Sequence, residues 1–198
     1  MILYSLIISA GLSRRMGKFK PLLNFNGRPV ISNIIDKLQR VSDKTIIVTG
    51  YKEEDVREAV TNGLHYSDLY DKITFVFNPD FESGMFTSLK RGIEAAENCD
   101  WLLYHFVDQP HLPENFYSRF INEIEDTYDW IQPSYCGSKG HPLLIKQNVF
   151  DLILSENDDS TLRKIANREE IKKKIWNCGF REVLEDMDTA ADYERLKM

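Results

Sequence analysis

The stretch "LYSLIISAGLSRRMGKFK", residues 3–20, determines the fold, because it joins a short apolar run to a basic loop that contains glycine. The run from Leu3 to Ile8 has no helical spacing and indicates a buried β-strand. The loop that follows holds Gly11, Gly17 and several Arg and Lys side chains. Loops at the carboxyl ends of parallel strands bind ligands in open α/β sheets, and glycine leaves backbone N–H groups accessible. The stretch therefore predicts a binding site for a polyphosphate.

Motif spacing excludes the two best-known phosphate loops. A P-loop has four residues between its glycines and a hydroxyl residue after its lysine, whereas five residues separate Gly11 from Gly17 and Phe19 follows Lys18. A dinucleotide fingerprint fails because its second glycine would fall at Ser13. A basic surface loop without a ligand is the alternative that the residues leave open.

Length and composition restrict the class of protein. With 198 residues and 42% hydrophobic content, the chain is expected to form a single domain over residues 1–198. The net charge of −6 and the scattered basic residues argue against nucleic acid as a ligand. Three widely spaced cysteines favour a reducing compartment over disulfides or structural zinc. The first residues lack a basic leader and their apolar run is too short to span a membrane, so we expect a cytoplasmic protein.

Strand and helix patterns alternate after the basic loop. Strands are expected at residues 45–50, 73–78, 101–107 and 130–135, with helices at 29–40, 53–60 and 84–97, a turn and strand at 138–145, and a largely helical charged segment at 162–175. Such alternation predicts an α/β fold, a three-layer Rossmann-like arrangement with a mostly parallel sheet and helices on both faces. The strand ends at residues 9, 50, 78 and 107 should then share one edge of the sheet.

Asp108 is the first candidate for metal binding. It follows the apolar run 101–107, and Pro110 prevents a helix from continuing through Gln109. Proteins usually hold Mg²⁺ and a nucleoside triphosphate through one or two carboxylates together with phosphate oxygens and waters. Asp108 is therefore predicted to bind Mg²⁺. The alternative is that Asp108 caps a helix around residues 113–126.

The basic loop resembles a known signature. "ISAGLSRRMGKFK" is similar to L-A-[AG]-G-x-S-x-R-M-G-x-x-K of the MobA/MocA-like NTP transferase family, which includes molybdenum cofactor cytidylyltransferase and guanylyltransferase, although Ser9 replaces the usual first alanine. The resemblance implies the fold of the nucleotide-diphospho-sugar transferases. It further implies that the loop wraps the triphosphate of the nucleotide. The nucleotide-binding residues implied in this loop are Ala10, Gly11, Ser13, Arg15, Gly17 and Lys20, of which Arg15 and Lys20 are the catalytic cations.

The same resemblance indicates which nucleotide is used. Guanylyltransferases of the family carry glycine at the position of Ala10, so this sequence resembles the enzymes that use CTP. The segment "NPDFESGMFTSL" is similar to N-P-x-x-x-x-G-M-x-x-S-L, which lines the nucleoside pocket, and this implies nucleotide-binding roles for Gly84 and Ser88. Phe86 and Thr87 depart from the smaller residues usual there. A turn followed by a helix cap at Gly84 is the structural alternative.

Two further segments extend the resemblance. "DQP" is similar to the metal-binding segment of the family and supports a catalytic, metal-binding Asp108, while "GHP" implies substrate-facing roles for Gly140 and His141, which otherwise suit a structural turn. His65, His105 and His111 have no partner at metal-ligand spacing and are not predicted to be ligands.

The carboxyl terminus completes the implied metal site. "EDMDTAADYERL", residues 185–196, resembles D-x-D-T-P-E-D-Y-x-x-L, with Ala190 and Ala191 in place of the usual Pro and Glu. The resemblance implies Asp188 as a second Mg²⁺ ligand, with Asp186 as the other candidate. The alternative is that Thr189 or Asp188 only caps a helix.

These parts imply a Mg²⁺-dependent nucleotidyltransferase. A phosphate oxygen of molybdopterin would attack the α-phosphorus of CTP and pyrophosphate would leave, which requires no general base. The expected partners are the small molecules CTP and molybdopterin, with a transient contact to a molybdoenzyme or its chaperone. The alternatives are a sugar phosphate or other small phosphate as the acceptor, or a non-catalytic nucleotide-binding accessory protein for a molybdoenzyme.

Overall fold

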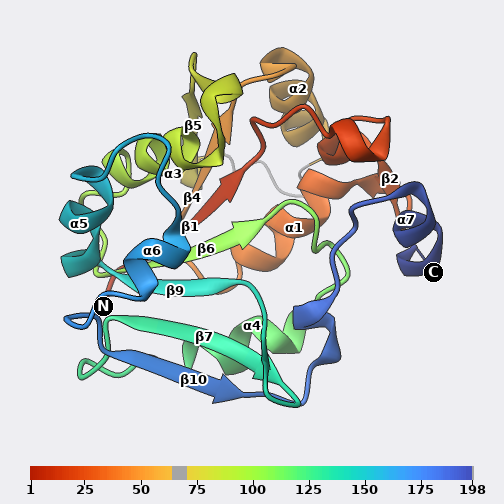
Figure 1. Cartoon of the computed structure of the whole chain (residues 1–198). Helices are drawn as coiled ribbons and strands as arrows, with labels where there is room; N and C mark the ends of the chain where they lie inside the picture. The colour runs from red at the N-terminus through yellow and green to blue at the C-terminus, as the bar shows by residue number, and fades with distance from the viewer. Residues whose placement is uncertain (64–70, 198) are drawn as a thin grey trace.

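A mostly parallel sheet forms the centre of the fold in this computed structural model, which describes residues 1–63 and 71–197 (Figure 1). Its strand order is β10-β7-β9-β6-β1-β4-β5, and the short β8 pairs with β7. The strands are β1 (Leu3–Ile8), β4 (Lys44–Thr49), β5 (Ile73–Phe77), β6 (Trp101–Phe106), β7 (Trp130–Tyr135), β8 (Ser138–Lys139), β9 (Leu143–Lys146) and β10 (Lys173–Asn177). A separate hairpin contains β2 (Asn24–Phe25) and β3 (Arg28–Pro29).

The direction of the strands determines where ligands can bind. β1 pairs in parallel with both β4 and β6, and β4 pairs in parallel with β5, so the carboxyl ends of these strands share one edge as predicted. β9 runs antiparallel to β6 and to β7. The chain moves outward from β1 to β4 and β5 and then returns to place β6 on the other side of β1. The crevice between the ends of β1 and β6 is therefore a topological switch point, where open α/β sheets bind ligands.

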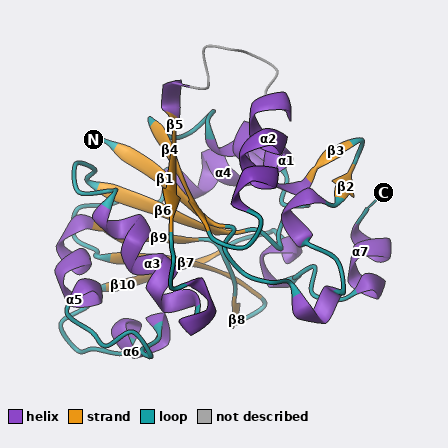
Figure 2. Ribbon diagram, turned by 90° about the horizontal axis from the view of Figure 1, so that it is seen from above, coloured by secondary structure: helices purple, strands orange, loops and turns teal. Residues whose placement is uncertain are grey.

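Helices cover both faces of the sheet, which confirms the predicted three layers (Figure 2). One face carries α1 (Val30–Leu38), α2 (Glu53–Gly63) and α4 (Glu114–Ile121), and the other carries α3 (Met85–Glu94), α5 (Phe150–Leu154) and α6 (Leu162–Ala166). α7 (Ala190–Leu196) lies beside the β2–β3 hairpin, where the Tyr193 hydroxyl donates to the Asn24 carbonyl at 2.5 Å. Short 3-10 helices are Arg14–Met16, Lys20–Leu22, Phe81–Ser83, Gln147–Val149 and Arg181–Leu184.

Each face of the sheet has its own hydrophobic core. Side chains alternate across β1, so Ile7 packs with α1 on one face and Leu6 packs with α3 on the other. Both are fully buried, as are Ile31 and Ile34 of α1. Burying a side chain of this size contributes about 1.5–3 kcal/mol, so the two cores fix β1 and the loop that follows it.

The charged segment 162–175 is the main error in the predicted elements. Only Leu162–Ala166 is helical there, and from Lys173 the chain forms strand β10, which pairs in parallel with β7. β10 lies at the edge of the sheet, and its residues alternate between exposed and half-buried. Lysines can occupy such an edge because their heads reach solvent while their stems cover the strand, so charge did not exclude a strand.

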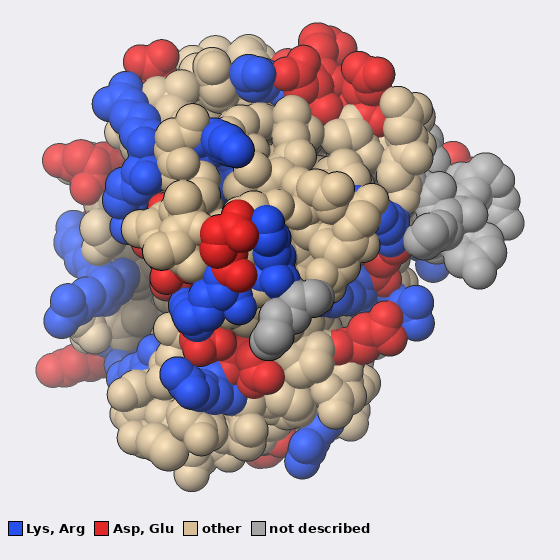
Figure 3. Space-filling view, turned by 90° about the vertical axis from the view of Figure 1, so that its right-hand side faces the viewer, with Lys and Arg blue, Asp and Glu red and all other residues tan. Residues whose placement is uncertain are grey.

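The surface carries charges of both signs. On the face that includes α7 and the β2–β3 hairpin, Lys and Arg side chains are interspersed with Asp and Glu (Figure 3). Within the described residues, every helix is too short or too polar to cross a membrane. His65, one of the three histidines not predicted to be ligands, lies outside the described residues.

Candidate active site

The basic loop, defined here as residues 9–20, leaves β1 and folds back on itself. The Ser9 N–H donates to the Val48 carbonyl at 2.8 Å, which ties the start of the loop to β4. Ser13 and Gly17 both have left-handed backbone conformations, with φ of 51° and 68°. The Ser13 hydroxyl accepts from the Lys20 N–H at 3.1 Å and so joins the two ends of the turn. Ser13 thus shapes the loop.

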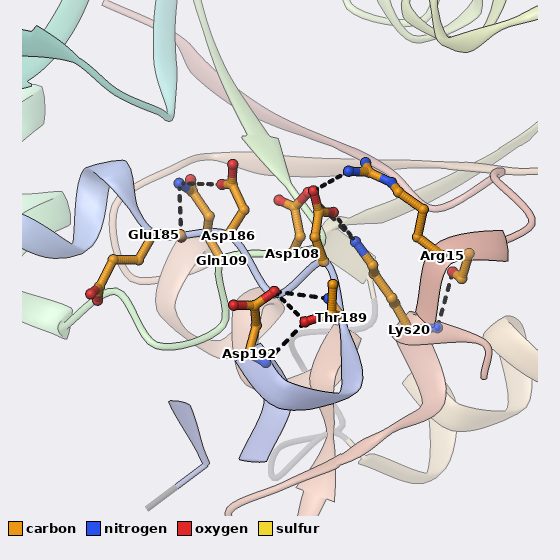
Figure 4. Close-up of polar contacts among 10 residues, drawn as sticks. Arg15, Lys20, Asp108, Gln109, Glu185, Asp186, Thr189 and Asp192 are labelled. Carbon is orange, nitrogen blue, oxygen red and sulfur yellow. Dashed lines mark hydrogen bonds and ion pairs between the residues drawn. The ribbon is translucent and has the colours of Figure 1, made fainter. Parts of the chain in front are cut away.

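The two cations predicted to contact phosphate differ in burial. The Lys20 side chain is 9% exposed and its Nζ lies 2.6 Å from Asp188 Oδ1 and 3.9 Å from Asp108 Oδ2. The Arg15 side chain is 74% exposed and its Nη1 lies 2.5 Å from Asp188 Oδ2. Both side chains point toward Asp108 and its neighbouring carboxylate in Figure 4. The structure therefore brings Arg15, Lys20, Asp108 and Asp188 together from three distant parts of the chain.

The C-terminal segment, defined here as residues 183–189, reaches this place through contacts with the residues around Asp108. The Met187 N–H donates to the Asp108 carbonyl at 2.8 Å. The side-chain amide of the fully buried Gln109 donates to the Val183 carbonyl at 3.3 Å, the Glu185 carbonyl at 3.4 Å and Asp186 Oδ1 at 3.1 Å. Gln109 therefore connects the segment that carries Asp108 to the segment that carries Asp188.

Lys37, like Gln109, was not predicted to belong to the site, and it supports the chain just after Asp108. Lys37 of α1 donates from Nζ to the carbonyls of Pro110 and Leu112, at 2.6 and 2.7 Å. Burial lowers the pKa of Lys37 to about 8. In the sequence, Gln109 and Lys37 stand out only as polar residues near apolar ones. That pattern does not identify the backbone carbonyls to which they bond.

Asp108 lies in an unfavourable environment for a negative charge. Burial, together with the nearby carboxylate of Asp186, raises the pKa of its carboxyl to about 6 against the opposing effect of Lys20. In the part of the chain that the structure describes, Asp108 Oδ1 is buried without a hydrogen-bond partner. An orphaned buried carboxylate oxygen is costly unless it serves a cation or a ligand.

The donor set around Asp108 fits a hard divalent cation. Within residues 1–63 and 71–197, no three His, Cys, Asp or Glu side chains already form a closed metal site. Asp108 and Asp188 nonetheless converge on Lys20, and two carboxylates together with phosphate oxygens and waters are sufficient for Mg²⁺. These two residues could hold the metal ion if Lys20 turned from them toward a phosphate. Asp188 contacts both cations directly, whereas Asp186 accepts a hydrogen bond from Gln109.

A cavity of about 260 Å³ adjoins these charges at the switch point between β1 and β6. Several predicted residues line it: Gly11, Ser13, Arg15, Lys20, Ser88 and Asp108. A side chain added at Gly11 would meet no other atom within 4 Å, so the backbone there is open to a ligand. We call this the basic-loop cavity.

Ala10, Ser88 and Gly84 have different surroundings. Ala10 is 1% exposed and its carbonyl accepts from the Tyr51 N–H at 3.1 Å, so its side chain packs in the core at the end of β1. The Ser88 hydroxyl lies 2.9 Å from Asn78 Nδ2. Gly84, with φ of 124°, lines a second cavity rather than the basic-loop cavity. The structure therefore places Gly84 and Ser88 in two neighbouring cavities.

Gly140 and His141 lie next to the site but outside this cavity. Gly140 packs against the backbone of Val183 so closely that a side chain would collide with the Val183 carbonyl, which explains why glycine occurs there. The His141 ring lies 4.3 Å from the ring of Phe106, and burial lowers its pKa to about 4. His141 is therefore neutral at pH 7. The substrate-facing roles of Gly140 and His141 stay predictions.

The other two described histidines have structural partners. His105 Nε2 lies 2.7 Å from the Tyr117 hydroxyl, and His111 Nε2 lies 3.3 Å from the Glu182 carbonyl. Asp108 does not cap a helix, because the N-cap of α4 is Pro113. Thr189 does cap α7, in a capping box with Asp192, which leaves the neighbouring Asp188 to pair with Arg15 and Lys20.

Solved structures share this fold over nearly the whole chain. A crystal structure of the Rv0371c protein of Mycobacterium tuberculosis aligns with a TM-score of 0.81 at 22% identity, covering 100% of this chain and 97% of that one. A nucleotidyl transferase of Methanothermobacter aligns with a TM-score of 0.80 at 20% identity, covering 99% of this chain and 96% of that one. Another structure of Rv0371c is a complex with manganese, with a TM-score of 0.76 at 20% identity, covering 100% of this chain and 98% of that one. The fold is thus that of the nucleotide-diphospho-sugar transferases.

Sequence relatives identify the family. The molybdenum cofactor cytidylyltransferase of Escherichia coli is 27% identical over 189 residues, 95% of this chain and 92% of the relative. A probable molybdenum cofactor guanylyltransferase of Bacillus cytotoxicus is 24% identical over 179 residues, 87% of this chain and 85% of the relative. The MobA-like NTP transferase domain matches residues 5–173. The chain therefore belongs to the MobA-like NTP transferase domain family, as the basic loop predicted.

Proposed function

We propose that this nucleotidyltransferase transfers CMP from CTP to the phosphate of molybdopterin, with Mg²⁺ as the metal ion. The observation that carries the proposal is the meeting of Arg15 and Lys20 with Asp108 and Asp188 beside the basic-loop cavity. Ala10, which resembles the residue of the CTP-using enzymes, and the similarity to a cytidylyltransferase over 95% of the chain support CTP over GTP.

In this proposal the cations of the basic loop act on the leaving group. Arg15 and Lys20 bind the β- and γ-phosphates of CTP, and the open backbone at Gly11 lets the phosphates approach the loop. The charge that develops on pyrophosphate is then neutralised as the bond to the α-phosphorus breaks. Loss of one such charge contact costs about 3 kcal/mol, or a hundredfold or more in rate.

The carboxylates of Asp108 and Asp188 supply the negative charge that holds the metal ion. Asp108 and Asp188 would hold Mg²⁺, which when bound neutralises the phosphates and orients them for in-line attack. Gln109 fixes the segment of Asp188 against Asp108, so these two side chains enter the site at a defined separation. The fit rests on the orphaned Oδ1 of Asp108 and on the hard oxygen donors present.

No side chain needs to remove a proton. A phosphate monoester is already anionic at pH 7, so its oxygen attacks the α-phosphorus directly and the rate comes from positioning. His141 contacts Phe106, which lines the cavity, and it is neutral and half-buried. We assign it no role in proton transfer.

Pyrophosphate release tests this function. Purified protein would be incubated with Mg²⁺ and either CTP or GTP, with and without molybdopterin. The expected result is release with CTP that depends on molybdopterin. Pyrophosphate release with GTP but not with CTP would mean that GTP is the nucleotide substrate. CTP binding without release would overturn molybdopterin as the acceptor, and sugar phosphates would then be screened to separate another acceptor from a protein that only binds nucleotides.

A further inference from the structure

One wall of the basic-loop cavity comes from the chain between β5 and α3. We define residues 78–88 as the β5–α3 segment. Phe81, Met85 and Ser88 of this segment line the cavity, as does the basic loop. The proposed function assigns the phosphates of the nucleotide to the basic loop, so the β5–α3 segment remains to contact the nucleoside. Whatever holds this segment in place therefore affects how well the nucleotide binds.

The hydrophobic cores do not hold the middle of the segment. Residues 79–85 are exposed, with the exception of the half-buried Phe81, and the 3-10 helix Phe81–Ser83 has no buried residue. Phe81 packs on the backbone at the end of β4, because a β-carbon added at Gly50 would lie 2.7 Å from the Phe81 Cβ. A single packing contact cannot order a turn of this length against the loss of backbone entropy. Hydrogen bonds must supply the remaining constraint.

Asn78 joins the two ends of the segment. It is fully buried, and its N–H donates to the Thr49 carbonyl at 2.9 Å, at the end of β4. Its side-chain oxygen Oδ1 accepts from the Asp80 N–H at 3.0 Å. Its Nδ2 donates to the hydroxyls of Thr87 and Ser88, both at 2.9 Å. Both hydrogens of the amide thus bind the first turn of α3, while its oxygen binds the turn that follows β5.

Thr87 extends this network into the middle of the segment. Its hydroxyl donates to the Gly84 carbonyl at 2.8 Å and lies 3.2 Å from the Asp80 carbonyl. The same Asp80 carbonyl accepts from the Ser83 N–H at 2.9 Å. Thr87 is 7% exposed, so water is poorly placed to replace these bonds if the Asn78 amide is removed.

We infer that Asn78 is a positioning residue for the nucleotide, because it keeps the β5–α3 segment folded so that Phe81, Met85 and Ser88 lie at the cavity wall before the nucleotide binds. Asn78 is not one of the described residues that line the cavity, so it acts through these neighbours. The inference rests on the part of the proposed function that places a nucleoside triphosphate in the basic-loop cavity. It does not depend on the identity of the base or of the acceptor.

Asn78→Ala removes the whole amide and tests the inference. We expect the dissociation constant and the KM of the nucleotide to rise about tenfold, as for a segment that is ordered in about one molecule in ten. The kcat at saturating nucleotide should stay within about twofold and the KM of molybdopterin should not change, because the bound nucleotide restores the segment. Titration with CTP and with GTP gives the dissociation constant, and pyrophosphate release gives the KM.

Asn148→Ala is the matched control. The Asn148 amide also joins two separate segments, since its Nδ2 donates to Asp129 Oδ1 at 2.7 Å. It lies at the other edge of the sheet, close to Lys146, which pairs with the first residue of β6. This variant should leave the dissociation constant of the nucleotide unchanged.

Thr87→Val is a milder variant that tests the same network if Asn78→Ala does not fold. It removes the hydroxyl that connects Asn78 to Gly84, and we expect the dissociation constant of the nucleotide to rise about threefold. Thr45→Val is its control, because Thr45 is fully buried on β4 and its hydroxyl has no hydrogen-bond partner within the described residues. That substitution should change neither the dissociation constant nor the KM.

Each outcome distinguishes the role of Asn78 from the function itself. An unchanged dissociation constant of the nucleotide in the folded variants would overturn the inference, even if the melting temperature fell, and would leave the function standing. A fall in kcat without a change in nucleotide affinity would also overturn it, because the segment would then act on the transfer step. Wild-type protein that binds neither CTP nor GTP would refute the proposed function together with this inference. Thermal melting of each variant verifies that it is folded.

Discussion

The basic loop and the C-terminal segment contribute opposite charges to the same site, yet they are held in different ways. The basic loop follows the central strand β1, is tied to β4 at Ser9, and closes on itself through Ser13. The C-terminal segment belongs to no strand of the sheet and is held by hydrogen bonds to Gln109 and to the backbone of Asp108, and by the buried side chains of Val183 and Met187. The position of the cations is therefore determined by the central strand, whereas the position of Asp188 is determined by a few hydrogen bonds and two buried side chains, Val183 and Met187.

This difference separates two kinds of perturbation. A change in the cores beneath β1 would displace the basic loop only by damaging the whole protein, because the same side chains stabilise the sheet. A change at Gln109 or Thr189 can loosen the C-terminal segment while the sheet stays intact. The following predictions use this contrast, beginning with the largest expected effect.

Asp108→Ala removes the residue on which the two regions meet. Its side chain is 23% exposed and it is a predicted metal ligand, so the rate of pyrophosphate release should fall a hundredfold or more. The fold should persist, because the backbone bond to Met187 remains. Asp126→Ala is the control, since the Asp126 side chain is 99% exposed and pairs with Lys146, which is not a residue of the site. Activity with Mg²⁺ like that of the wild type would remove Asp108 from the site.

Asp108→Asn should stabilise the protein in a manner that depends on pH. Burial raises the pKa of Asp108 to about 6 in the folded state, above its ordinary value of 3.8, so the folded protein holds this proton more tightly than the unfolded chain. Wild-type stability is therefore lost as pH rises through about 6, and the variant avoids that loss. We expect the variant to be more stable by about 1–3 kcal/mol at pH 7.5, with little difference at pH 4, in urea unfolding. Equal stability at both pH values would contradict the environment assigned to Asp108.

Gln109→Leu should loosen the C-terminal segment and leave the basic loop in place. The three hydrogen bonds of the amide are lost, and we expect about a tenfold fall in kcat/KM together with a higher Mg²⁺ concentration for half-maximal rate. A merely structural defect would lower the melting temperature without changing the Mg²⁺ requirement. Gln147→Leu is the control, because the Gln147 amide bonds the Glu97 carbonyl away from the site.

Thr189→Ala should give the smallest effect. Thr189 is the N-cap of α7 and forms a capping box with Asp192, and the loss of such a cap costs about 1 kcal/mol. Because α7 has no buried residue, the cost should fall on the helix itself and activity should decrease only a few-fold. Hydrogen exchange of residues 190–196 measures this, and unchanged exchange would show that the capping box does not hold the segment.

The sequence was sufficient to predict the sheet and the basic loop because both depend on local patterns. Leu6 and Ile7 alternate between two cores, and α1 has apolar residues at helical spacing, so strand and helix could be assigned without knowing their partners. The strand β10 could not be assigned in this way. Apolar and polar residues do not alternate clearly in its sequence because the strand lies at the edge of the sheet, and its lysines resemble the exposed face of a helix.

The site could be predicted as a set of residues but not as a set of contacts. Asp108 and Lys20 are identified by their motifs, and the resemblance supplies Asp188 from a segment far along the chain. Gln109 lies in the same "DQP" segment as Asp108, but its role could not be inferred from the sequence, since that role depends on carbonyls of residues more than seventy positions away. The choice between Asp186 and Asp188 likewise depends on which carboxylate faces Lys20 in three dimensions, and the structure places Asp188 there.

The ion pairs of Asp188 with Arg15 and Lys20 have a thermodynamic consequence. A triphosphate that takes the two cations leaves the carboxylate without a partner, and a metal ion that takes the carboxylate leaves the cations without one. Each ligand therefore prepares the site for the other, and their binding free energies are coupled with positive cooperativity that must be equal in both directions. The nucleotide and the metal ion should consequently bind as one complex, with an affinity far above that of either component alone.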